Sequence, residues 1–77
     1  MKKEYVKVIS EFDTLGNIRP ITIIWHDDTK FDIDRVIESK PRASLKAGGV
    51  GIRYTVRIKG TITHLYLEDN RWFVEAK

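Results

Sequence analysis

The chain contains no cysteine, which excludes both a disulfide framework and a thiolate metal site. It also lacks a long apolar run, because the longest, Ile23–Trp25, is far below the roughly 20 residues that a membrane-spanning helix needs. The charged stretch Met1–Glu4 is not followed by an apolar signal core. These absences predict a soluble, cytoplasmic protein without a membrane partner.

With 77 residues, the chain is expected to form one small β domain, residues 1–77. A domain of this size buries a modest core and has little room for a ligand pocket of about 300–1,000 Å³. The sequence also lacks the strand–turn–helix pattern that exposes a nucleophilic serine. We therefore expect a protein that is not an enzyme and holds no cofactor.

Short stretches of alternating apolar and polar residues, separated by turn signals, predict an all-β, antiparallel fold. The expected strands cover 5–12, 18–26, 30–38, 52–58, 61–67 and a last stretch after residue 70. Pro20 indicates a sheet edge or a bulge, and a change of apolar phase near Arg35 indicates a second bulge. Because five or six short strands must cover their apolar faces without helices, we predict a small, strongly bent barrel or half-barrel, SH3-like or OB-like.

Residues 39–51 interrupt the alternation and are expected to form one long, glycine-containing loop. A single helical turn fits residues 43–47. The Gly-Gly-Val-Gly run at 48–51 has two interpretations. It forms an anion-binding nest of backbone N–H groups supported by Lys46 and Arg53, or its glycines only let the chain turn tightly.

The last third of the chain predicts two hairpins with two-residue turns at Lys59-Gly60 and Asp69-Asn70. On the outer face, the predicted register pairs Arg57 with Ile62, Thr55 with His64, Arg53 with Tyr66, and Tyr66 with Phe73. On the core face, it pairs Ile58 with Thr61, Val56 with Thr63, Tyr54 with Leu65, Ile52 with Leu67, and Leu67 with Trp72. A slip of one residue would exchange the two faces, so the predicted site depends on this register.

The charges of the chain are distributed unevenly around a net charge of +3. No acidic residue lies between Glu38 and Glu68. The cations in that span are Lys40, Arg42, Lys46, Arg53, Arg57 and Lys59. Such a span marks either a surface that meets an anionic partner or an uneven solvated face.

Basic and aromatic residues alternate on the predicted outer face of the last sheet, which includes Arg53, Tyr66 and Phe73. This pattern suits nucleic acid, because aromatic rings stack on bases while arginines bind phosphates. The other interpretation is that Tyr66 and Phe73 form a cross-strand pair that stabilises the sheet. The residues assigned to a nucleic-acid or anion site are Lys40, Arg42, Lys46, Arg53, Arg57, His64 and Tyr66.

The turn His26-Asp27-Asp28 combines an imidazole with two carboxylates, which are possible metal ligands or general bases. Three consecutive side chains diverge, and aspartates in a hairpin turn usually bond to their own backbone. We therefore expect no metal here. Trp25 and Trp72 flank turns and are expected to close the ends of the core.

Residues 24–36, 43–54 and 72–74 resemble a family of short bacterial proteins of unknown function. In that family, the first stretch reads approximately Trp-x-Asp-Gly-x-x-Tyr-x-Ile-Asp-x-Val. This chain has Asp28 where the pattern has glycine, and an aspartate can adopt the positive φ of such a turn. The resemblance covers most of the chain and implies a compact β domain, but no reaction, ligand or catalytic residue.

The leading functional hypothesis is a non-enzymatic β domain that binds nucleic acid or another polyanion. The alternative is a protein-interaction or structural module, which self-associates through an exposed strand edge or offers an aromatic groove to a peptide. A metal-binding or enzymatic domain remains a minor alternative.

Overall fold

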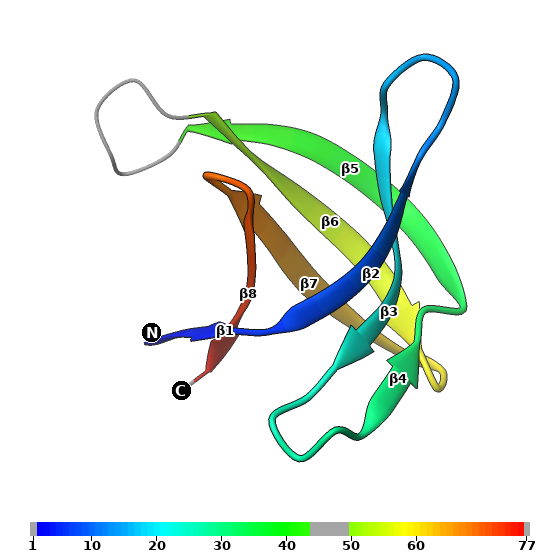
Figure 1. Ribbon diagram of the computed structural model, residues 1–77, viewed down its shortest axis with the longest axis vertical. Coiled ribbons are helices and arrows are strands. Elements are labelled where there is room, and N and C mark those ends of the chain that lie inside the picture. Colours follow the sequence, from blue (N-terminus) through cyan, green and yellow to red (C-terminus); the bar gives the residue numbers. More distant parts are fainter. Residues whose placement is uncertain (1, 44–49, 77) are drawn as a thin grey trace.

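The computed structural model describes residues 2–43 and 50–76, which form an all-β fold of antiparallel strands (Figure 1). The strands are β1 (Lys2–Tyr5), β2 (Lys7–Phe12), β3 (Ile18–Ile24), β4 (Lys30–Asp32), β5 (Arg35–Ala43), β6 (Val50–Ile58), β7 (Thr61–Glu68) and β8 (Arg71–Ala76). One sheet has the order β1-β8-β7-β6-β5 and the other β2-β3-β4. Neither sheet is closed on itself. No helix that could cross a bilayer occurs within the described part of the chain.

The chain passes between the two sheets at two corners. At the first, the Val6 amide donates to the Trp72 carbonyl at 3.0 Å, between β1 and β2. At the second, between β4 and β5, the Ile33 amide donates to Ile21 in one sheet and the Asp34 amide to Arg57 in the other, both at 2.9 Å. Each corner divides a stretch that the sequence predicts as one strand. The described residues therefore form eight strands rather than five or six.

The predicted register of the last two hairpins is confirmed at every predicted pair, on both the outer and the core face. Both turns have the left-handed backbone that two-residue hairpins need. Lys59 and Gly60 have φ of 50° and 78°, and Asp69 and Asn70 have φ of 52° and 61°.

Both predicted irregularities occur as bulges. The β2–β3 register shifts between Ile9 and Ser10, and Pro20 lies opposite Ser10. The pairing of β3 with β4 covers Thr22–Ile24 and begins after Pro20. The missing N–H of Pro20 therefore removes no hydrogen bond between these two strands. In β5, the register shifts between Val36 and Glu38.

The prediction of a long loop over residues 39–51 is wrong at both of its ends. Strand β5 continues to Ala43, and β6 begins at Val50. Pro41 is tolerated because β5 is an edge strand of its sheet, where a residue without an N–H is acceptable. Ala43, the first residue of the expected helical turn, belongs to β5 instead. The rest of that turn, residues 44–47, and the first two glycines of the 48–51 run lie outside the described residues.

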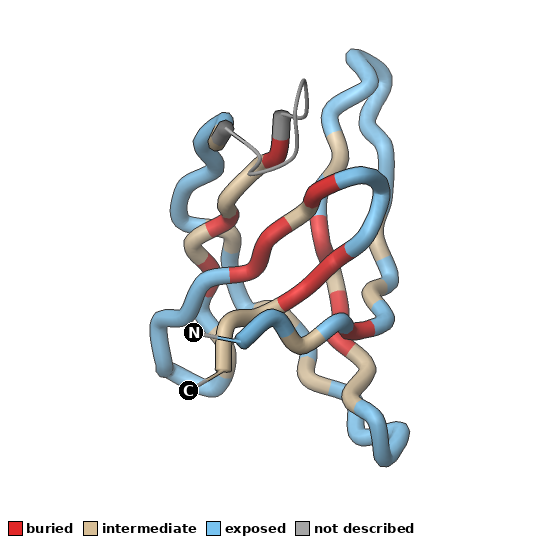
Figure 2. The backbone as a smooth tube through the Cα atoms, turned by 90° about the vertical axis from the view of Figure 1, so that its left-hand side faces the viewer, coloured by how far each residue is buried: buried red, intermediate tan, exposed pale blue. Residues whose placement is uncertain are grey.

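The core lies between the two sheets, and Figure 2 shows that the buried positions follow the middle of the strands while the hairpin tips are exposed. Its buried members are Val6, Ile23, Tyr54, Val56, Leu65 and Trp72, with Trp25, Ile52, Ile58, Leu67 and Val74 packed against them. This confirms the predicted core face of β6, β7 and β8. Tyr54 also joins the sheets, because its hydroxyl donates to the Ile18 carbonyl at 2.7 Å.

We expect Tyr54→Phe to lower the free energy of unfolding by about 0.5–1.5 kcal/mol, because it removes this hydrogen bond and leaves a carbonyl without its partner. The measurement is urea unfolding followed by tryptophan fluorescence. Tyr5→Phe is the matched control, since no hydrogen bond of the Tyr5 hydroxyl occurs among the described residues. Equal unfolding midpoints for the two variants would contradict the prediction.

Candidate nucleic-acid interface

The face of the five-stranded sheet that points away from the core carries the predicted site. Because directly opposed residues in antiparallel strands point to the same side, one row crosses all five strands. It runs Lys40, Arg53, Tyr66, Phe73, Tyr5. We call these residues the central row. Its first half is basic and its second half is aromatic.

The aromatic residues of the central row contact one another. The rings of Tyr66 and Phe73 are stacked, with centroids 5.0 Å apart and planes 9° apart. Tyr5 meets Phe73 edge to face at 5.7 Å. Only 6% of Tyr66 and 1% of Phe73 is exposed. The interpretation as a cross-strand pair is therefore correct, and neither ring offers a free face to a base.

Each aromatic ring of the central row has a cation over it. The Arg71 guanidinium lies 3.6 Å from the Tyr5 centroid. The Lys3 ammonium lies 4.7 Å from the centroid of Phe73, and the Arg42 guanidinium lies 4.7 Å from that of Tyr66. Cations over ring faces are attracted by the ring quadrupole. The surface over the aromatic residues therefore carries three cations, of which Lys3 is also paired with Glu68 at 3.2 Å.

Arg42 and the basic half of the central row surround a shallow depression of about 520 Å³. It is lined by Lys40, Pro41, Arg42, Arg53, Tyr66 and Glu75. Burial raises the pKa of the Tyr66 hydroxyl, as do its hydrogen bond with Glu75 and the negative charge of that carboxylate. The charges of Arg42 and Arg53 lower the same pKa. The phenol is therefore neutral at physiological pH, and the charge inside the depression is set by the three cations and Glu75.

Like charges face each other directly at two places on the outer face of β5 and β6. Lys40 is opposite Arg53, and Arg35 is opposite Arg57. Lys40 is paired with Glu38, with 3.6 Å between Nζ and Oε1. Within the described residues, neither arginine of β6 forms an ion pair. Opposed like charges destabilise a sheet, and Glu38 offsets the charge of Lys40.

The structure therefore brings Lys40, Arg42, Arg53 and Tyr66 together around one depression. Arg57 lies on the same face, four residues farther along β6. His64 also lies there, exposed, with its ring centroid 6.4 Å from that of Tyr66. Lys46, also assigned to the site, lies outside the described residues.

Sequence reasoning missed Arg35, Lys3 and Arg71 on this face. Arg35 meets Arg57 only because the β5 bulge sets the register at that end of the hairpin. Arg71 is placed by the β7–β8 hairpin, in which it is opposite Glu68. Lys3 is brought in by the pairing of β1 with β8, which joins the two ends of the described chain (Figure 1). No local signal in the sequence predicts that pairing.

Gly51 is explained by packing against β7. A Cβ added to Gly51 would lie 2.6 Å from the Glu68 Cγ and 3.0 Å from the Leu67 carbonyl oxygen. Glu68 is held in this place by Lys3, whose Nζ donates to its Oε1 at 3.2 Å. The glycine therefore permits a close approach of β7.

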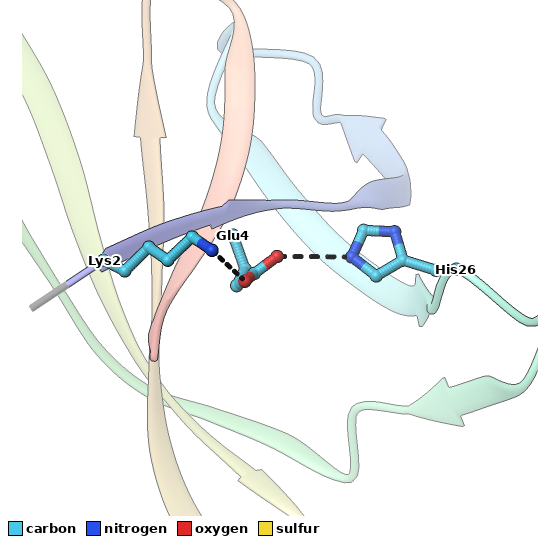
Figure 3. Close-up of polar contacts among 3 residues, drawn as sticks. All are labelled: Lys2, Glu4 and His26. Atoms are coloured by element: carbon cyan, nitrogen blue, oxygen red, sulfur yellow. Dashed lines mark ion pairs between the residues drawn. The ribbon is translucent and has the colours of Figure 1, made fainter. Parts of the chain in front are cut away.

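The turn after β3 is organised by its own side chains. Asp28 has a φ of 67°, as expected for a residue in the place of glycine. Asp27 accepts a hydrogen bond from the Thr29 amide at 3.0 Å. His26 faces Glu4, with 3.5 Å between Nε2 and Oε2, and Glu4 also meets Lys2 (Figure 3). No group of three or more metal-ligating side chains occurs within residues 2–43 and 50–76.

Two apolar features lie away from the basic face. The tip of the β2–β3 hairpin projects from the body of the molecule (Figure 1) and leaves Phe12 72% and Leu15 86% exposed. A mainly apolar depression of about 420 Å³ opens between the two sheets. Its lining includes Ile23, Trp25, Phe31, Ile58 and Val74.

No protein-family model, curated protein or solved structure matches the chain. The geometry of the outer face is therefore the basis of the functional proposal, and the family resemblance remains a prediction.

We expect Arg57→Thr to raise the free energy of unfolding by about 0.2–1 kcal/mol at low salt, because it removes a charge opposed to Arg35. Thermal unfolding would measure the change. Lys30→Thr is the control, since Lys30 is an exposed strand residue opposite an apolar one, Ile24.

The gain should disappear near 1 M salt, where the Debye length falls to about 3 Å. A gain that is equal in the control, or that survives high salt, would argue against repulsion between the two arginines.

Proposed function

We propose that this protein is a non-enzymatic β domain that binds nucleic acid or another polyanion on the outer face of β5 and β6. The observation that carries the proposal is the pair of directly opposed like charges, Lys40 with Arg53 and Arg35 with Arg57. The phosphates of a bound strand would attract all four of these cations and so offset both repulsions. Within the described residues, Arg42 and His64 complete the proposed site.

The spacing of the cations favours an extended ligand. Arg53 and Arg57 are four residues apart in one strand, which corresponds to about 13 Å at the usual rise per residue. A polymer with repeated negative charges can bind at both ends of this surface.

We also propose a more specific fold class. We assign an SH3-like or OB-like half-barrel, because β1 continues into β2 and β4 into β5 at the two corners, so that the two sheets follow each other around the core. Open barrels of this kind commonly bind oligonucleotides. A cytoplasmic location is also proposed, and the absence of cysteine is compatible with it.

The test is titration of a fluorescently labelled single-stranded oligonucleotide at about 50 and about 200 mM salt. Binding should weaken steeply with salt, because each neutralised phosphate releases counterions. The double variant Arg53→Gln/Arg57→Gln should bind more weakly. The slope of log K against log salt should become less steep by about 1.4, which corresponds to two lost phosphate contacts.

The matched control is Lys7→Gln/Lys30→Gln, which removes the same formal charge from exposed positions on the three-stranded sheet. We expect this control to retain the salt slope of the wild type. Equal weakening in both double variants would mean that net charge, rather than the outer face, determines binding. If the wild type binds the oligonucleotide at neither salt concentration, the proposed function is refuted.

A second candidate function is self-association. The aromatic groove expected for a peptide partner receives no support from Tyr66 and Phe73, which are buried. The exposed apolar tip of the β2–β3 hairpin supports self-association instead, because Leu15 and Phe12 of one copy would bury their apolar surface in the depression beside Trp25 and Phe31 of another. Contacts of this kind, between a protruding and a hollow surface of the same molecule, join copies head to tail.

Self-association predicts that the sedimentation coefficient of the wild type rises with concentration, and that Leu15→Ser abolishes the rise. Ile62→Ser is the control, because Ile62 is also an exposed apolar residue but lies on β7, away from the hairpin. A wild-type protein that stays monomeric across the concentration range would exclude this function.

A further inference from the structure

We infer that the outer face binds the phosphodiester backbone of a nucleic acid strand and that the aromatic rings of the central row make no stacking contact with its bases. This inference rests on the proposed function and names what the same surface recognises. It departs from the usual recognition of single strands, in which bases lie on exposed aromatic rings.

The first argument is the burial of the aromatic rings. Phe73 is 1% exposed and Tyr66 6% exposed. The two rings use one face on each other, in a parallel stack at 5.0 Å. Tyr5 is 39% exposed, but the Arg71 guanidinium lies 3.6 Å from the centroid of its ring. A base would have to displace a cation from a favourable site before it could stack.

The second argument concerns what the cations do. Arg42 is held over the Tyr66 ring, beside Lys40 and Arg53. A guanidinium that rests on a ring is fixed in orientation while its N–H groups remain able to donate to an oxyanion. Stacking therefore prepares Arg42 for a phosphate. In this surface, the aromatic residues serve as supports for cations.

The third argument is that the depression has the chemistry of a phosphate site. Three cations converge on it, and Glu75 is its one acidic lining residue. The Glu75 carboxylate hydrogen-bonds to Tyr66, which directs it toward the phenol. A planar arginine beside further donors can bind phosphate oxygens in a bidentate manner.

The test compares two labelled strands of equal length, oligothymidylate and a fully abasic deoxyribose-phosphate strand. We expect dissociation constants that agree within about twofold and parallel salt dependences. Loss of even one stacked base would weaken binding about fivefold or more. Tight binding of oligothymidylate with clearly weaker binding of the abasic strand would overturn the inference and leave the proposed function intact. Binding of neither strand would refute both.

A second comparison tests the role of the stacked arginine. Arg42→Gln should weaken binding and reduce the salt slope by about 0.7, as for one lost phosphate contact. Arg42→Lys keeps the charge and should keep the slope, but it should bind more weakly because the ammonium lacks the planar fork. Lys7→Gln is the control. An Arg42→Lys variant that binds as tightly as the wild type would contradict the role given to the guanidinium.

Inorganic phosphate distinguishes a polymeric ligand from a free anion. At equal total phosphate, we expect it to displace the labelled strand far less than unlabelled abasic strand does. Equal displacement by the two competitors would show that the depression binds single phosphate groups, and would overturn the assignment of a strand as the ligand.

Discussion

The alternation of side chains along β6 and β7 is the constraint on which the rest of this molecule depends. The turn at Lys59 and Gly60 sets which residues oppose each other. With this register, Tyr54 and Val56 enter the core and Arg53 and Arg57 point away from it. Because a shift of one residue would bury the arginines and expose the core, folding and the proposed binding surface are specified by the same pairing.

The outer face combines elements that stabilise the fold with elements that oppose it. The aromatic cluster of Tyr5, Phe73 and Tyr66 joins three neighbouring strands. Burial of aromatic rings contributes strongly to the stability of a small domain. The opposed cations on β5 and β6 destabilise the same sheet by repulsion. An aromatic stack at one end of the central row thus supports a sheet that carries repulsive charges at its other end.

Arg42 connects these two parts of the surface. It belongs to the cationic depression and also rests on the ring of Tyr66. The same aromatic residues that suggest base stacking in the sequence are therefore occupied, in the folded chain, by cations. This is why a pattern of arginines and aromatics on one face predicts that these residues lie together but does not predict what the aromatic residues contact.

The local pattern of residues 52–76 determined their strands, turns, register and core face, because two-residue hairpins depend only on neighbouring sequence. It also placed Arg53, Arg57, His64 and Tyr66 on one face. Tertiary structure alone decided the corners at Val6 and Asp34, the extension of β5 to Ala43, and the pairing of β1 with β8. These features depend on contacts between residues far apart in the chain. Their free energy combines the entropic cost of loop closure with the gain from burial, and a local sequence pattern encodes neither. The burial of Phe73 beneath Lys3 and Tyr5 follows from that last pairing.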